Sequence, residues 1–165
     1  MNRLSTAGVS AAFAVMLGVV VVTAQRGSTP SVVGVWRVSE VTLTGPNARK
    51  IMSPQPSVRI FTRSHYSINE VTADKPRTEL PASNATDKQL VDAFSNFTGQ
   101  AGTYEIKGNE LTTKRIAALN PNIMRSGSFA TLSFTVEGNT LTLVQKSNQD
   151  GPTANPTTWK LTRVE

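Results

Sequence analysis

Cysteine is absent from this chain, and histidine occurs once among its 165 residues. Without cysteine there is no disulfide, no thiolate nucleophile, no iron–sulfur cluster and no cysteine-ligated zinc site. The single histidine, His65, falls in an expected turn between two strands, where an exposed side chain is typical, and it lacks the partner residues that a zinc or copper site needs. We therefore expect neither a metal site nor a cofactor.

Sequence motifs of enzymes are also missing. Residues 126–128, Ser-Gly-Ser, are not a nucleophile elbow, and no phosphate-binding loop or dinucleotide fingerprint occurs. The carboxylates Glu70, Asp74 and Glu79 lie close in sequence. No pattern sets two of them face to face at the roughly 5–10 Å that a glycosidase pair requires. The sequence predicts no catalytic residue and favours a protein that is not an enzyme.

Basic residues outnumber acidic ones by 17 to 11, which gives a formal net charge of +6. Such a charge can attract nucleic acid, anionic lipid or an acidic ligand. The basic residues are spread along the chain, however, and form adjacent pairs only at 49–50 and 114–115. Binding of single-stranded nucleic acid needs basic residues interleaved with exposed aromatic ones. Because this pattern is lacking, we expect no nucleic-acid partner.

The one long apolar run lies near the N-terminus, at residues 11–22. Arg3 precedes it, and residues 22–24 fit the cleavage site of a secretory signal peptide. The run is shorter than the ~20 residues of a membrane-spanning helix, although a retained anchor stays open as the alternative. We expect a signal peptide over 1–24, a flexible start over 25–32, no stable membrane span after cleavage, and a periplasmic or secreted protein.

The remaining residues have the pattern of short strands separated by glycine, proline and polar turns. Segments 104–112 and 134–142 are near copies of one hairpin, each with Gly-Asn at its turn, a dipeptide that favours a two-residue hairpin loop. The clearest alternation of apolar and polar residues covers 130–136. Strands are expected at 34–43, 57–62, 66–72, 103–107, 111–117, 130–136, 141–143 and 159–164.

A single amphipathic helix is expected after Thr86. The Thr86 hydroxyl and Gln89 form the pattern of a capping box, and Gly99 suits a left-handed stop. An apolar stripe at helical spacing should lie against another apolar surface. The residues of this stripe are Leu90, Val91, Phe94 and Phe97.

About eight short strands and one helix predict an all-β fold. An even meander with one apolar face closes into an antiparallel up-and-down barrel, because closure removes the exposed sheet edges. An eight-stranded barrel is either filled by side chains or holds one small ligand, and the sequence leaves both open. The apolar residues expected on the inner face are Val58, Ile60, Tyr66, Ile68, Tyr104, Ile106, Leu132, Phe134, Leu141, Leu143 and Trp159, with Thr113, Arg115 and Gln145 as polar groups among them.

Part of this inner face is the candidate ligand site, because ligand pockets combine apolar walls with a few orienting polar groups. Arg115 is the residue that could pair with an anionic head group. The candidate site consists of Tyr66, Ile68, Tyr104, Ile106, Arg115, Leu132 and Phe134.

The chain resembles the bacterial lipocalin-like domain family, which comprises small barrels of the calycin type. The resemblance rests on Gly-Val-Trp at 34–36, on the order of elements from the helix through 141–143, and on a closing strand with Trp159 and Arg163. It extends over roughly 33–164, so we assign 33–165 to one lipocalin-like β-barrel domain. It implies that Trp36 plugs the closed end of the barrel with Arg163 stacked on its ring.

Three functional hypotheses follow. The leading one is an exported, monomeric barrel that binds a small apolar or amphipathic ligand in its interior. The second is a protein-binding or inhibitor barrel that acts through the polar loops at 73–84 and 149–156. The third is a pocket enzyme, an isomerase or hydrolase, which would need an inward polar residue such as Glu70 with a shifted pKa.

Overall fold

The computed structural model describes residues 31–165, so the expected signal peptide at 1–24 lies outside the described residues. Short 3-10 turns occur at Gly45–Asn47 and Pro121–Met124. The strands are β1 (Gly34–Leu43), β2 (Arg49–Ile51), β3 (Ser57–Phe61), β4 (His65–Val71), β5 (Phe97–Lys107), β6 (Glu110–Ala118), β7 (Phe129–Glu137), β8 (Thr140–Asn148), β9 (Gly151–Pro152) and β10 (Thr158–Arg163), and the α-helix is α1 (Asp87–Ser95).

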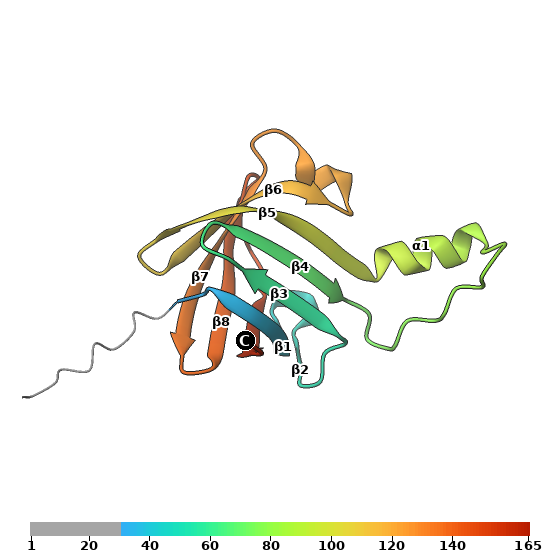
Figure 1. The fold of residues 1–165 in the computed structure, drawn as a ribbon, viewed down its shortest axis with the longest axis horizontal. Coiled ribbons are helices and arrows are strands. Elements are labelled where there is room, and N and C mark those ends of the chain that lie inside the picture. Colours follow the sequence, from blue (N-terminus) through green and yellow to red (C-terminus); the bar gives the residue numbers. More distant parts are fainter. Residues whose placement is uncertain (1–30) are drawn as a thin grey trace, which may run out of the picture.

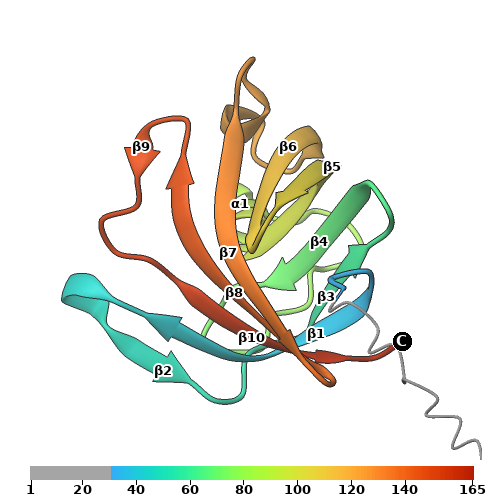
Figure 2. The same ribbon diagram turned by 90° about the vertical axis from the view of Figure 1, so that its left-hand side faces the viewer.

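Eight of these strands form a closed antiparallel barrel (Figure 1). Their order is β1, β3, β4, β5, β6, β7, β8 and β10, and β10 pairs with β1 to close the ring. The short strands β2 and β9 extend the wall by pairing with β1 and β8. Figure 2 looks into the ring of strands. The expected all-β barrel with one helix is confirmed.

The two repeated hairpins are the β5–β6 and β7–β8 pairs. Gly108 and Gly138 stand at the first position of each turn with φ of 61° and 56°. A positive φ at this position belongs to the turns whose twist matches that of paired strands, and glycine adopts it without steric cost. The hairpins predicted from the Gly-Asn repeats are confirmed.

The helix begins as predicted and ends earlier. Both hydrogen bonds of the capping box between Thr86 and Gln89 are present. The helix ends at Ser95, where Asn96 caps it by donating from its side chain to the carbonyl of Asp92 at 2.9 Å. Phe97, expected on the helix, instead opens β5 and pairs with β4. Gly99 also lies within β5, so its predicted role as helix stop is wrong.

The apolar stripe of α1 does not pack against the barrel. Leu90, Val91 and Phe94 are 49%, 60% and 47% exposed, and no residue of the helix is buried. The helix lies beyond the ends of β4 and β5 (Figure 1). The expectation that the stripe lies against an apolar surface is wrong for this structure. Among residues 31–165, no helix has the length and apolar character needed to cross a membrane.

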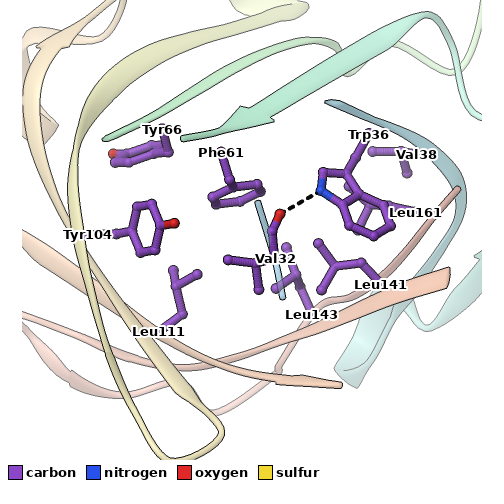
Figure 3. Packing of buried hydrophobic residues seen from close by; sticks show 10 residues of the cluster. All are labelled: Val32, Trp36, Val38, Phe61, Tyr66, Tyr104, Leu111, Leu141, Leu143 and Leu161. Atoms are coloured by element: carbon purple, nitrogen blue, oxygen red, sulfur yellow. Dashed lines mark hydrogen bonds between the residues drawn. The ribbon is translucent and has the colours of Figure 1, made fainter. Parts of the chain in front are cut away.

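Large apolar side chains fill one end of the barrel (Figure 3). Trp36 is fully buried there, and its indole N–H donates to the carbonyl of Val32 at 2.7 Å. The guanidinium of Arg163 lies 4.0 Å from the Trp36 ring centroid and donates to the carbonyl of Val33 at 2.8 Å. These contacts confirm that Trp36 plugs the closed end and that Arg163 stacks on it.

The register of β3 differs from the one expected. Val58 and Ile60 were assigned to the inner face, but Ile60 is 38% exposed while Arg59 and Phe61 are 3% exposed. Side chains alternate along a strand, so a shift of one residue exchanges the two faces completely. Phe61 packs in the closed-end core against Tyr66 and Tyr104. This packing fixes β3 with Arg59 directed inward.

Candidate ligand-binding site

Beyond the closed-end core, the barrel interior is hollow. The cavity has a volume of about 430 Å³, within the roughly 300–1,000 Å³ range of small-molecule pockets. Leu111 on β6 and Leu143 on β8 belong to the core. Two residues further along the same strands, Thr113 and Gln145 line the cavity. The smaller or polar side chains at these positions leave the interior unfilled.

The structure brings four of the seven predicted site residues to this cavity. Tyr66, Ile68, Arg115 and Leu132 line it. Tyr104 and Phe134 instead belong to the closed-end core and its surrounding apolar layer. Ile106 lies near the tip of the β5–β6 hairpin and is 44% exposed. The three residues outside the cavity lie on the same face of the sheet as those that line it. They lie nearer the closed end of the barrel, beyond the cavity.

Arg115 is the cavity-lining arginine that has no acidic partner. Its Nε donates to the side-chain oxygen of Gln100 at 3.2 Å, and its Nη1 lies 3.5 Å from the Ser128 hydroxyl. No carboxylate of residues 31–165 forms an ion pair with it. The guanidinium therefore has no anionic partner, and its Nη2 group has no hydrogen-bond partner among these residues, so it is placed to bind an anion.

Close approach of β5 and β6 places Arg115. Gly102 lies opposite Arg115 in the ladder, at a bulge that follows Ala101. A Cβ on Gly102 would lie 1.9 Å from the carbonyl oxygen of Lys114, so the approach requires glycine. Bulges change the direction in which neighbouring side chains point. Regular alternation along β6 directs Thr113 and Arg115 to the interior and Lys114 to the outside, and the bulge interrupts this alternation directly after Arg115.

A comparison with family models gives one match, to the lipocalin-like domain, over residues 33–162. The chain belongs to the lipocalin-like domain family. No curated protein and no solved structure matches the chain. The family match covers every strand of this lipocalin-like barrel except the last residue of β10, and the predicted resemblance is confirmed.

Tyr66 stands between the core and the cavity of the lipocalin-like barrel. It is 3% exposed, and its hydroxyl donates to the same Gln100 oxygen that accepts from Arg115, at 3.4 Å. Burial raises the pKa of Tyr66 above its ordinary value of 10.0, an effect opposed by the charge of Arg115 and a hydrogen bond with Thr113. The phenol therefore stays neutral and remains a hydrogen-bond donor at physiological pH.

A buried ion pair forms a second polar part of the cavity wall. Arg59 on β3 donates from Nε to Glu70 on β4, and their side chains are 3% and 12% exposed. The Arg59 guanidinium also lies over Trp159, 4.8 Å from the ring centroid. Arg59 is not among the site residues predicted from the sequence, because the apolar pattern of β3 predicts its other face inward. Glu70 is the residue that could have pointed to Arg59. It lies on the same face of β4 as Tyr66 and Ile68, so its carboxylate is directed inward and needs a cation beside it.

The rim of the cavity carries a second, exposed ion pair. Arg49 on β2 lies 2.9 Å from Asp74, with side chains 48% and 69% exposed. Arg49, Thr72 and Ala73 also line the cavity. An exposed ion pair contributes only about 0–1 kcal/mol to stability. The contact between Arg49 and Asp74 therefore holds β2 to the segment after β4 only weakly.

The cavity has the composition that is typical of ligand pockets. Its walls combine apolar residues with the Arg115 and Arg59–Glu70 groups. Glu70 is the inward carboxylate that a pocket enzyme would need, but Arg59 holds one of its oxygens. Within the described part of the chain, no group of three or more His, Cys, Asp or Glu side chains is placed to hold a metal ion. His65 is exposed, at the β3–β4 turn.

Proposed function

We propose that this lipocalin-like barrel is an exported, monomeric carrier of one small amphipathic molecule with a single negative charge. The observation that carries the proposal is the guanidinium of Arg115, which lines a cavity of about 430 Å³ and has no carboxylate partner among residues 31–165. A buried or half-buried arginine normally has an acidic partner, because an unpaired charge is costly to remove from water. An anionic ligand supplies that partner.

The charges of the cavity wall support a monoanion. Arg59 and Glu70 neutralise each other, and the rim residue Arg49 pairs with Asp74. Arg115 leaves one uncompensated positive charge. A ligand with one carboxylate or sulfonate balances it, whereas a dianion would bring a second charge that the interior does not neutralise.

The apolar part of the ligand supplies most of the affinity. Ile68, Leu132, Val38 and Val41 line the cavity. Burial of apolar surface contributes about 25 cal/mol per Å², before the loss of translational and rotational freedom on binding is subtracted. An uncharged molecule of the same shape therefore also binds, and the charge adds to this affinity.

Two dyes with the same aromatic skeleton separate these contributions. 1-Anilinonaphthalene-8-sulfonate carries a negative charge, and N-phenyl-1-naphthylamine is neutral. A charge-assisted hydrogen bond contributes about 1.5–3 kcal/mol, so Arg115→Ala should weaken the sulfonate about tenfold or more. Binding of the neutral dye should change little. Fluorescence titration of both dyes measures the two affinities.

The matched control is Lys114→Ala. Lys114 is the neighbouring residue on β6, its side chain is 64% exposed, and it pairs with Glu105 on the outside of the barrel. Like Arg115→Ala, the Lys114→Ala variant removes one positive charge from the protein, but it leaves the cavity unchanged. The affinities of both dyes should therefore stay the same. Equal weakening of both dyes by Arg115→Ala, or equal effects of the two variants on the sulfonate, would count against an anion site at Arg115.

Export is the part of the proposal supported by sequence alone. Arg3, the apolar run at 11–22 and the residues at 22–24 have the pattern of a signal peptide. Expression of the full chain in a bacterium with a periplasm, followed by intact mass measurement of the periplasmic fraction, tests it. A mass equal to residues 25–165 is expected. Full-length protein retained in the cytoplasm would contradict export.

A further inference from the structure

The Arg59–Glu70 pair has hydrogen-bonding capacity that the protein does not use. Within residues 31–165, the bond from Arg59 Nε to Glu70 Oε1 is the side-chain hydrogen bond of both residues. No fully buried polar side-chain atom of this part of the chain lacks a partner. The second oxygen of Glu70 and the terminal nitrogens of Arg59 therefore retain accessible surface, and both residues line the cavity.

These atoms offer an acceptor beside a donor at one point of the cavity wall. The ion pair is neutral overall, so it attracts neither an anion nor a cation strongly. A hydroxyl group matches it, because a hydroxyl both donates and accepts a hydrogen bond. It would donate to the free oxygen of Glu70 and accept from the guanidinium of Arg59.

The ladder places Arg59 two strands away from Gln100, whose side chain accepts a hydrogen bond from Arg115 on the next strand, β6. Arg59 lies opposite Ile68, and Ile68 lies opposite Gln100, which holds Arg115. Two strand spacings of about 4.8 Å separate Arg59 from Gln100, or about 10 Å across the sheet. The apolar side chain of Ile68 lies between the two polar points and lines the cavity.

We propose that the ligand is a hydroxylated monocarboxylate, with its carboxylate on Arg115, its hydroxyl on the Arg59–Glu70 pair, and an apolar segment between them that packs on Ile68. This inference rests on the proposed function, because it takes the anion site at Arg115 as given. It names the chemical class of the ligand, and it makes the ion pair a specificity determinant.

Two acids that differ by one hydroxyl test this assignment. Decanoate and 10-hydroxydecanoate are titrated calorimetrically into the protein. In a purely apolar pocket the hydroxylated acid binds more weakly, because its hydroxyl loses water without a new partner. A site built to bind the hydroxyl has the opposite preference. We expect 10-hydroxydecanoate to bind at least about tenfold more tightly than decanoate.

A variant that removes the pair as a unit completes the test. Replacing one partner alone would leave a buried charge unpaired and endanger folding, whereas replacing both by apolar residues of similar volume is often neutral. Arg59→Met combined with Glu70→Leu should reverse the preference, so that decanoate binds more tightly. The matched control combines Glu105→Gln with Lys114→Gln, an exposed pair on the outer face, and should keep the preference of the unmodified protein.

The outcomes separate the two proposals. If neither acid binds, the proposed carrier function fails and the inference fails with it. If decanoate binds and the hydroxyl weakens or does not change binding, the carrier function stands and the hydroxyl site is overturned. A preference for the hydroxylated acid that persists in the Arg59→Met, Glu70→Leu variant also overturns it. A preference present in the unmodified protein and lost in that variant supports it.

Discussion

The two ends of the barrel are built from the same strands and differ in what fills them. At the closed end Trp36, Leu141 and Leu161 are fully buried and belong to one cluster of apolar side chains (Figure 3). Toward the other end, residues of the same strands, among them Thr113, Leu132 and Gln145, surround a space of about 430 Å³. One end resembles the core of a folded domain, and the other resembles a binding pocket.

This difference shows how one sheet separates stability from binding. Alternation directs every second residue of each strand inward, and the size and polarity of those residues change along the barrel axis. Large apolar residues at the closed end provide the burial that stabilises the fold. The open half can then hold an unpaired guanidinium and a buried ion pair, groups that cost stability.

The largest effect is expected at the closed end. Trp36→Ala should lower the free energy of unfolding by about 3–5 kcal/mol, because it leaves a large cavity in a packed core. Trp159→Ala is the matched comparison, since Trp159 is partly buried and faces existing cavity space. The Trp159→Ala variant should lower the free energy of unfolding by clearly less than Trp36→Ala does. Urea denaturation measures both, and equal losses would contradict the division between a filled and a hollow half.

The next effect is expected where β5 and β6 approach. Gly102→Ala introduces a Cβ that would meet the Lys114 carbonyl at 1.9 Å, and such overpacking costs about 1–3 kcal/mol. Because Gly102 lies opposite Arg115 in the ladder, the variant should also displace Arg115 and weaken binding of 1-anilinonaphthalene-8-sulfonate. Gly99→Ala is the control, as its nearest neighbour is the Phe97 side chain at 3.3 Å. A Gly102→Ala protein with unchanged stability and binding would contradict this account.

A smaller effect is expected from Tyr66 at high pH. Burial raises the pKa of Tyr66 above 10.0 in the folded protein, so the unfolded chain loses the phenol proton first. The contribution is complete below about pH 10 and is lost as pH rises through the folded-state pKa. Tyr66→Phe should therefore lose less stability than the unmodified protein between about pH 9 and pH 11. Denaturation at both pH values checks this, and parallel losses would contradict it.

The smallest effect on global stability is expected in α1. Thr86→Ala removes the capping box and should destabilise the helix by about 1 kcal/mol. None of the helix residues is buried, so the unfolding midpoint of the barrel should stay nearly unchanged. Hydrogen exchange should show faster exchange in α1 alone. A lowered midpoint for the whole protein would mean that the helix packs on the barrel in solution.

Local signals allowed much of the fold to be predicted from the sequence. The hairpins at Gly108 and Gly138 could be predicted because the conformation of a two-residue turn depends on residues that are adjacent in sequence. The start of α1 at Thr86 was predictable for the same reason. Its end was not, because pairing of Phe97 with Val71 across β4 and β5 overrides the helical spacing.

Features that depend on distant residues were harder to predict. Both faces of β3 carry apolar residues, so the sequence alone left its register ambiguous, and Arg59 was missed. Packing of Phe61 against Tyr66 and Tyr104 decides the register. The sequence could not predict whether the barrel interior is hollow. The cavity depends on the combined volume of the inward side chains from eight strands. Arg115 was identified correctly as an inward polar group, since β6 alternates regularly up to that residue.

The most direct test of the central claim is to locate a bound dye by NMR. Two surfaces of the protein could bind an apolar dye. One is the cavity in the hollow half of the barrel, and the other is the exposed apolar stripe of α1. With 1-anilinonaphthalene-8-sulfonate bound to methyl-labelled protein, we predict intermolecular nuclear Overhauser effects to the Ile68 and Leu132 methyl groups, which line the cavity. Contacts to Leu90 and Val91 of the helix, with none to Ile68 and Leu132, would contradict interior binding.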